Sequence, residues 1–215
     1  EHDLEGALEA LAAELGALGE APANKAELQR PDLPSGAVDL DKIAAILGAL
    51  LPENAVVVDE SVTSGRGFFP LTSGAPAHCW LNGMGGSIGY AMPVSIGAAV
   101  AAPDRKIVTL EGDGSGMYTV QALWTMAREN LDVTVIVFAN RAYRILQGEL
   151  TNVGVQNPGP RAVDMLSLDR PAVDWTSMAK SLGVESSRAT DCEGLIRAIR
   201  HGLAVDGPYL IELVL

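Results

Sequence analysis

Short apolar runs alternate with segments of helical periodicity from about residue 39 to the end of the chain. Apolar runs predict strands, because a strand buried on both faces is apolar throughout. They cover residues 55–59, a stretch just after His78, and residues 106–110, 133–138 and 209–214. Residues 184–188 are more polar and are predicted as a further strand. Between the runs, helical segments are predicted at residues 41–51, 83–102, 117–127, 174–182 and 192–203. This alternation predicts an α/β fold, with a parallel sheet of about six strands and helices on both faces.

The first 34 residues do not follow this pattern. Residues 4–18 are rich in Ala, Leu and Glu with amphipathic spacing, which predicts a helix. The polar stretch after it contains Pro22, Pro31 and Pro34, a composition typical of a linker. We therefore expect a helix and linker over residues 1–34, followed by one domain over residues 35–215. The alternative is a helix that packs on the same core.

One internal segment shows no clear period. Residues 147–170 are rich in Gly, Pro and Asn, which predicts a long loop. A loop of that length in a compact domain is usually functional or mobile.

Composition excludes several classes of protein. A length of 215 residues suits one domain with a substantial core, and a formal net charge of −12 argues against binding to nucleic acid or anionic membranes. No apolar run is long enough to span a membrane, and we recognise no signal peptide. Cys79 and Cys192 are far apart in the sequence and lack metal or redox spacing, which favours reduced thiols. We therefore expect a cytoplasmic protein.

The segment Glu111–Ser115 joins a predicted strand to a helix, and Asn140 ends the next predicted strand. Because ligands bind where the carboxyl ends of parallel strands meet, Asp113 and Asn140 should lie side by side at such a site. The glycines within residues 112–116 allow a phosphate to approach the backbone and the helix start. Asp113 would repel a diphosphate unless Mg²⁺ lay between them, with Asp113 and Asn140 as oxygen ligands. Met117 replaces the third glycine of a dinucleotide-binding fingerprint, so the unit predicts a Mg²⁺–diphosphate site instead.

This unit resembles the signature of thiamine diphosphate (ThDP) enzymes. Gly112-Asp113-Gly114, a spacer of 25 residues and Asn140 match that signature, although Ala139 stands where the family usually has a first Asn. Residues 59–64, 85–93 and 140–143 support the resemblance. It covers about residues 35–215 and is closest to the C-terminal, diphosphate-binding domain of acetolactate synthase and benzoylformate decarboxylase. Residues 1–34 would then be the tail helix of a middle domain plus a linker. The alternative is a glycine-rich turn in an unrelated α/β domain.

The resemblance implies particular roles for individual residues. Asp113, Asn140 and the main-chain carbonyl of Ala142 would bind Mg²⁺. Ile88 would hold ThDP in its bent conformation, and the carbonyl of Gly86 would accept a hydrogen bond from the pyrimidine amino group. The residues that would contact the cofactor are Thr63, Ser64, Gly86, Ile88, Gly112, Gly114, Ser115, Tyr118 and Tyr143. The alternatives are structural: a helix N-cap for Asp113, a turn for Asn140, and core packing for Ile88 and the two tyrosines.

Asp59 and Glu60 lie beside the same predicted site and are candidates for an acid–base pair. The resemblance implies, however, that the carboxylate that activates ThDP is a Glu of the N-terminal, pyrimidine-binding domain of a neighbouring chain. Nothing in residues 1–215 matches that domain. The chain would need it as a partner, on the same polypeptide or on a second subunit, in a homodimer or tetramer. Ile145 and Leu146 are candidate walls of the substrate pocket.

The implied function is ThDP- and Mg²⁺-dependent decarboxylation or carboligation of a small 2-oxoacid, as in acetolactate synthase. One alternative is a ThDP-dependent lyase that acts on 2-hydroxyacyl-CoA or oxalyl-CoA, for which Arg141, Arg144 and Arg161 are candidate CoA contacts. The other alternative is a non-catalytic subunit that only binds the cofactor.

Overall fold

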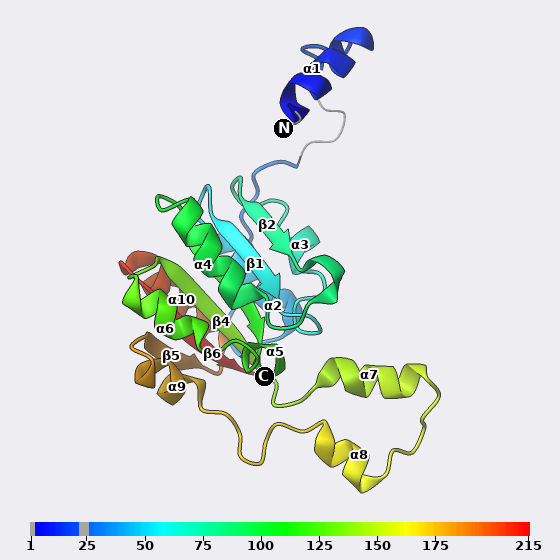
Figure 1. Ribbon diagram of the computed structural model, residues 1–215, viewed down its shortest axis with the longest axis vertical. Coiled ribbons are helices and arrows are strands. Elements are labelled where there is room, and N and C mark those ends of the chain that lie inside the picture. The colour runs from blue at the N-terminus through cyan, green and yellow to red at the C-terminus, as the bar shows by residue number, and fades with distance from the viewer. Residues whose placement is uncertain (1–2, 22–25) are drawn as a thin grey trace.

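The chain folds around one six-stranded sheet in which all neighbouring strands are parallel, in the order β2-β1-β3-β4-β6-β5 (Figure 1). The computed structural model describes residues 3–21 and 26–215, so His2 and Pro22 lie outside the described residues. The strands are β1 (Val56–Glu60), β2 (Cys79–Asn82), β3 (Ile107–Gly112), β4 (Val133–Ala139), β5 (Glu185–Ala189) and β6 (Tyr209–Val214). The prediction of an α/β fold with about six parallel strands is confirmed.

Helices cover both faces of the sheet. One face packs against α2 (Leu40–Leu50), α3 (Phe68–Leu71) and α10 (Cys192–Ala204), and the other against α4 (Ala91–Ala101), α6 (Ala122–Arg128) and α9 (Trp175–Ser181). Strand β4, in the middle of the sheet, is buried at all seven positions. Strands covered on both sides are apolar throughout, which explains the runs in the sequence. Trp175 is fully buried.

The directions of the chain connections between strands show where along the sheet a ligand site is expected. After β1 the chain passes through α3 to the edge strand β2, whereas after β3 it passes in the opposite direction to β4. The carboxyl ends of β1 and β3 therefore flank the point at which the strand order reverses, where ligands bind in open α/β sheets.

Three predictions about elements were wrong. The helix expected over residues 83–102 begins only at Ala91, because residues 83–90 form a turn with a short 3-10 segment, Met84–Gly86. The helix expected over residues 117–127 forms only from Ala122, as α6, because residues 117–121 are a turn that separates it from α5 (Asp113–Gly116). The long loop expected over residues 147–170 contains most of α7 (Arg144–Asn152) and all of α8 (Pro160–Met165). Neither helix buries a residue in this structure.

The first helix, α1 (Leu4–Glu14), lies apart from the sheet and its helices (Figure 1). None of its residues is buried, which argues against the alternative of a helix packed on the same core. Further along the chain, Gln29 contacts the sheet domain: its N–H donates a hydrogen bond to the carbonyl of Gly74 at 2.8 Å. The division at residue 34 stays a prediction. Among the described residues, no helix is both long enough and apolar enough to cross a membrane.

A candidate cofactor and metal site at the carboxyl edge of the sheet

Asp113 and Asn140 lie at the ends of adjacent strands, as the sequence predicts. Register pairs Gly112 of β3 with Phe138 of β4, so the residues that follow them meet at the sheet edge. The Oδ2 atom of Asp113 accepts a hydrogen bond from the N–H of Arg141 at 2.6 Å. Arg141 has a φ of 56°, a left-handed conformation that turns its N–H toward the carboxylate. Asp113 therefore does not cap a helix but holds the loop after β4.

The environment of Asp113 suits a cation. The side chain is 5% exposed, and burial raises its pKa to about 6, an effect opposed by hydrogen bonds from the main chain of Arg141 and Gly114. A nearby cation would lower that pKa again, because it favours the charged form. In the described parts of the chain, no three His, Cys, Asp or Glu side chains are grouped to hold a metal ion. A metal here must therefore use amide and main-chain oxygens as well, a set of hard ligands that fits Mg²⁺.

Asn140 and Ala142 are close enough to share this role. The Oδ1 atom of Asn140 accepts a hydrogen bond from the N–H of Ala142 at 3.0 Å, which closes the turn after β4. The alternative of a turn residue therefore describes the contact that Asn140 makes here. Its assignment as a metal ligand, like that of Ala142, stays a prediction.

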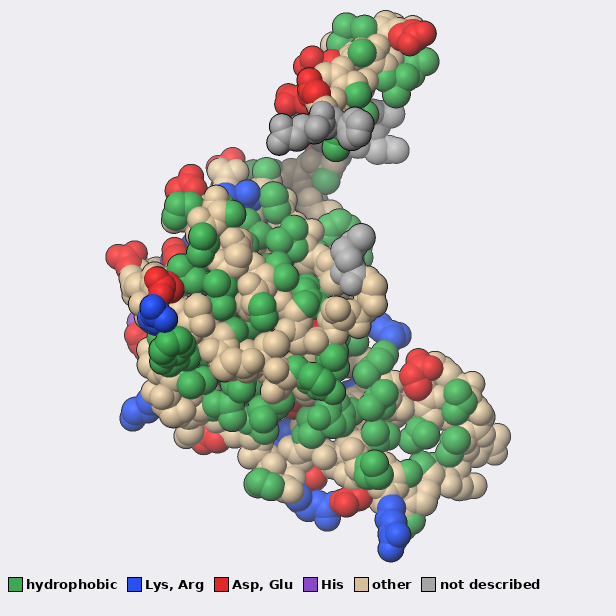
Figure 2. Space-filling model, viewed as in Figure 1, with side chains coloured by type: hydrophobic (Ala, Val, Ile, Leu, Met, Phe, Trp, Pro, Cys, Tyr) green, Lys and Arg blue, Asp and Glu red, His purple; other side chains and the backbone are tan. Residues whose placement is uncertain are grey.

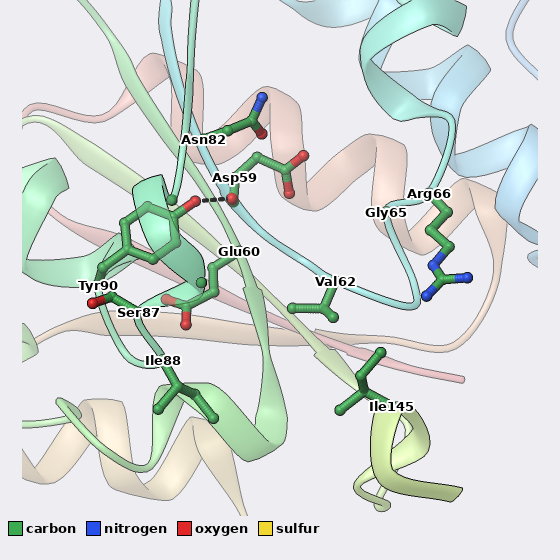
Figure 3. Close-up of a pocket in the computed structure, with 12 residues that line it drawn as sticks. Asp59, Glu60, Val62, Gly65, Arg66, Asn82, Ser87, Ile88, Tyr90 and Ile145 are labelled. Carbon is green, nitrogen blue, oxygen red and sulfur yellow. Dashed lines mark hydrogen bonds between the residues drawn. The ribbon is translucent and has the colours of Figure 1, made fainter. Parts of the chain in front are cut away.

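A cleft of about 440 Å³ lies beside this turn, between the loop after β1 and the turn before α4 (Figure 3). Ile88 projects into it and is 54% exposed, whereas the buried face of α4 begins at Ala91 and Met92. Gly86 lines the same cleft. The alternative that Ile88 belongs to the core is therefore wrong.

Other predicted contacts lie around a neighbouring hollow of about 480 Å³, which is lined by Thr63, Ser64, Asn140 and Arg144 among others. Val62 lines the first cleft and has a φ of 48°, so the loop after β1 turns sharply between the two hollows. The structure thus places Gly86 and Ile88 in one hollow and Thr63, Ser64 and Asn140 in the other, whereas Asp113 and the rest of the glycine-rich turn line neither of the two.

The residues of the glycine-rich turn differ in their surroundings. The Ser115 hydroxyl donates to Oε1 of Glu111 at 2.5 Å, so in this structure it points into the protein. A Cβ on Gly114 would lie 2.8 Å from the ring of Tyr143, which places that ring directly against the turn. Tyr118 is 56% exposed and lies against Gly89, where a Cβ would be 2.7 Å from that of Tyr118.

Ile145 and Leu146, the two candidates for the wall of the substrate pocket, line different hollows. Ile145 lines the first cleft, whereas Leu146 lines an apolar groove between α7 and α8 (Figure 3). Only Ile145 therefore lies where a substrate in the cleft would meet it.

Sequence reasoning named Glu60 as a candidate acid but missed that it pairs with a second buried acid, Glu111, at the site. Glu60 and Glu111 are register partners on β1 and β3, and their side chains are 4% and 0% exposed. Burial raises the pKa of both carboxyls, most strongly that of Glu111, which also faces the charge of Glu60. Among the described residues, Oε2 of Glu111 has no hydrogen-bond partner. The available signal was an acid at the end of each of two apolar strands.

Comparisons with known proteins agree with this geometry. Residues 66–213 match the family described as "Thiamine pyrophosphate enzyme, C-terminal TPP binding domain", thiamine pyrophosphate being another name for ThDP. A protein of Mycobacterium tuberculosis named "Putative acetolactate synthase large subunit IlvX" is 49% identical over 209 residues, which are 97% of this chain and 40% of the relative. Benzoylformate decarboxylase of Pseudomonas aeruginosa is 30% identical over 168 residues, which are 78% of this chain and 30% of the relative.

A solved structure supports the fold. The 4-hydroxybenzoylformate decarboxylase of Rhodococcus jostii, described as thiamine diphosphate-dependent, superposes with a TM-score of 0.73 at 24% identity, over 93% of this chain and 38% of that one. The chain thus spans about two fifths of the length of the Mycobacterium tuberculosis relative and of the Rhodococcus jostii structure. With the family match over residues 66–213, these findings show that the chain belongs to the thiamine pyrophosphate enzymes through their C-terminal, TPP-binding domain.

Proposed function

We propose that this chain binds ThDP and Mg²⁺ as the diphosphate-binding part of an acetolactate synthase-like 2-oxoacid decarboxylase or carboligase. The observation that carries the proposal is the buried Asp113 at the end of β3, next to the point where the strand order reverses, and its contact with the turn that follows Asn140 at the end of β4. Family membership supports the cofactor, and relatives named acetolactate synthase and benzoylformate decarboxylase support the reaction class.

The chain would hold the cofactor with residues that follow the ends of four strands, β1 to β4. Asp113, Asn140 and the carbonyl of Ala142 would bind Mg²⁺, while Thr63, Ser64 and the turn at residues 112–115 would surround the diphosphate. Ile88 and the carbonyl of Gly86 would hold the bent conformation, with Tyr118 and Tyr143 closing the sides. When bound, ThDP supplies an electron sink for the loss of CO₂ from a 2-oxoacid.

The carboxylates that line the cleft are already engaged. Asp59 accepts hydrogen bonds from the N–H and hydroxyl of Ser61 at 2.9 and 2.5 Å, and one from Nε1 of Trp80 at 3.3 Å. Glu60 accepts two from main-chain N–H groups. Neither is placed for proton exchange with a cofactor. This supports the proposal that the activating Glu comes from a pyrimidine-binding domain, on the same polypeptide or a second subunit.

The alternative of a CoA-dependent lyase receives less support. Arg144 lines the hollow beside Asn140, whereas Arg161 lines a surface on α8, so the candidate arginines do not form one basic surface over the cleft. A non-catalytic cofactor-binding subunit would share every feature described so far and differ only in lacking a partner with an activating Glu.

Titration calorimetry of ThDP with and without Mg²⁺ tests the proposal on the wild-type chain, on Asp113→Ala and on Asp104→Ala. Asp104 is exposed and precedes the amino end of β3, so it is a control at the opposite edge of the sheet. We expect Mg²⁺-dependent binding that Asp113→Ala abolishes and Asp104→Ala preserves. Equal binding by wild type and Asp113→Ala would contradict the metal site. If the chain does not bind ThDP either alone or together with a pyrimidine-binding domain, the proposed function is wrong.

A further inference from the structure

The start of α4 is held by a side chain from a distant strand. The Glu60 carboxylate at the end of β1 accepts hydrogen bonds from the N–H of Gly89 at 2.5 Å and from the N–H of Ala91 at 2.8 Å. In the described residues, α4 has no cap from its own segment, whereas α2, α9 and α10 are each capped locally by an Asp. The first N–H groups of a helix lack partners within it, so Glu60 supplies what the local sequence omits.

Two more contacts hold the same turn. The Tyr90 hydroxyl donates to the main-chain carbonyl of Asp59, next to Glu60 (Figure 3). The Thr119 hydroxyl donates to the carbonyl of Gly89 at 2.8 Å. The turn before α4 is thus fixed from the ends of two strands, β1 on one side and the segment after β3 on the other.

The turn needs this support because its own sequence stabilises it poorly. Gly85, Gly86 and Gly89 all have positive φ values, and glycine loses more conformational entropy on folding than any other residue. Ile88, between them, is half exposed and gains little from burial. Nothing in the apolar core therefore fixes the direction in which Ile88 points.

We propose that Glu60 is a positioning residue: by binding the main chain on both sides of Tyr90, it holds Ile88 in the cleft in the orientation that the cofactor requires. This inference rests on the proposed function, because it assigns Ile88 to ThDP. Glu60 acts through the turn and is not a catalytic acid or base, since both of its carboxylate oxygens are occupied by N–H groups. The cleft is shaped before any ligand enters, which lowers the ordering cost of binding.

The test compares Glu60→Gln with Glu212→Gln, a matched variant at another buried glutamate. Glu212 is 1% exposed and binds Arg188 from β6, away from the cleft. Glutamine has nearly the size of glutamate but only one acceptor oxygen, so Glu60→Gln leaves one N–H of the turn without its acceptor. Two quantities are measured: hydrogen exchange of residues 85–91 without ligand, and the affinity for ThDP with Mg²⁺ by calorimetry.

We expect Glu60→Gln to speed amide exchange at Gly89 and Ala91 and to weaken ThDP binding, each by about tenfold, a typical effect of one lost hydrogen bond to a charged group. Glu212→Gln should change neither quantity, although it lowers the melting temperature. Unchanged exchange in residues 85–91, or faster exchange with unchanged affinity, overturns the inference. If Glu60→Gln does not fold, Thr119→Val, which removes the bond to Gly89 from the other side, is measured in the same way with the same criteria.

The outcome separates this inference from the proposed function. Binding that Asp113→Ala abolishes and Glu60→Gln leaves unchanged refutes the role of Glu60 alone. Binding that is equal in wild type and Asp113→Ala refutes the metal site. The exchange measurement needs no cofactor. Unchanged amide exchange in residues 85–91 of Glu60→Gln therefore refutes the positioning role of Glu60, whatever the outcome for the metal site.

Discussion

The buried carboxylate of Asp113 destabilises the ligand-free fold when it is charged, and it is also the proposed metal ligand. Burial raises its pKa from 3.8 to about 6, so the folded chain binds this proton more tightly than the unfolded chain. The free energy of unfolding should therefore rise as the pH falls from about 6 toward 4, and at pH 8 the buried charge destabilises the fold. A shift of this size corresponds to an upper limit of about 3 kcal/mol, of which we expect about 2 kcal/mol once the neighbouring groups relax around the charge.

We therefore predict that Asp113→Asn raises the free energy of unfolding of the ligand-free chain at pH 8 by about 2 kcal/mol. The gain should shrink at pH 4, where folded wild-type Asp113 is protonated. Urea unfolding at the two pH values measures this, and comparison with wild type cancels the contributions of Glu60 and Glu111. The same variant should lose Mg²⁺-dependent ThDP binding. A variant no more stable than wild type at pH 8 would contradict the prediction.

The sequence could place Asp113 beside Asn140 because two successive parallel strands end at the same edge of the sheet. It could not place Glu60 over Glu111, since that pairing depends on the register between β1 and β3, which the packed helices determine. It could not show that the Ser115 hydroxyl points inward to Glu111. A serine at this position could equally point outward to a phosphate. Motif spacing thus locates the site but not the network beneath it.

Strand β6 contains a further buried acid, Glu212, whose side chain is bound by one arginine. Glu212 is 1% exposed on β6, between β4 and β5, and its Oε2 accepts hydrogen bonds from Nε and Nη2 of Arg188 at 3.0 and 2.9 Å. Arg188→Met would leave this carboxylate buried without its cation. We expect a loss of about 2 kcal/mol in the free energy of unfolding, below the range for a fully buried pair because Arg188 is 44% exposed.

The control for this prediction is Arg128→Met. Arg128 pairs with Glu129 on the surface, with both side chains more than half exposed, so its removal should change the free energy of unfolding by less than about 1 kcal/mol. Urea unfolding of both variants makes the comparison. Equal losses in the two variants would show that Glu212 does not depend on Arg188.

Helices and strands that face the core could be predicted from the sequence. Helices α7 and α8, which do not face the core, could not be predicted. Strands β1, β3, β4 and β6 and helices α2, α9 and α10 follow from apolar periodicity, because burial imposes it. Helices α7 and α8 leave apolar side chains exposed, among them Leu146, Val163 and Met165 (Figure 2). The glycines and prolines of this segment indicated a loop instead. The break between α5 and α6 was missed because the hydroxyl contact of Thr119 with Gly89, which holds the intervening turn, is tertiary.

At the scale of the whole molecule, α1 contributes nothing to the core. It has no buried residue, and its leucines 4, 8 and 11 are each more than half exposed. We predict that removing residues 1–21 leaves the melting temperature of this chain unchanged within about 1 °C, because the free energy of unfolding reflects buried contacts. Thermal unfolding of both forms measures it. A clear loss of stability would mean that α1 packs on the sheet domain in solution.

The chain spans about two fifths of its acetolactate synthase-like relative, and the acids of its cleft are engaged by their own neighbours. A chain that binds ThDP but lacks a free carboxylate beside it should not release CO₂. We therefore predict that residues 1–215 alone, saturated with ThDP and Mg²⁺, show no decarboxylation of pyruvate or benzoylformate above the rate of free ThDP. The benzoylformate decarboxylase of Pseudomonas aeruginosa serves as the positive control for the assay. Turnover by the isolated chain would show that the activating group lies within these residues, with Glu60 the first to test.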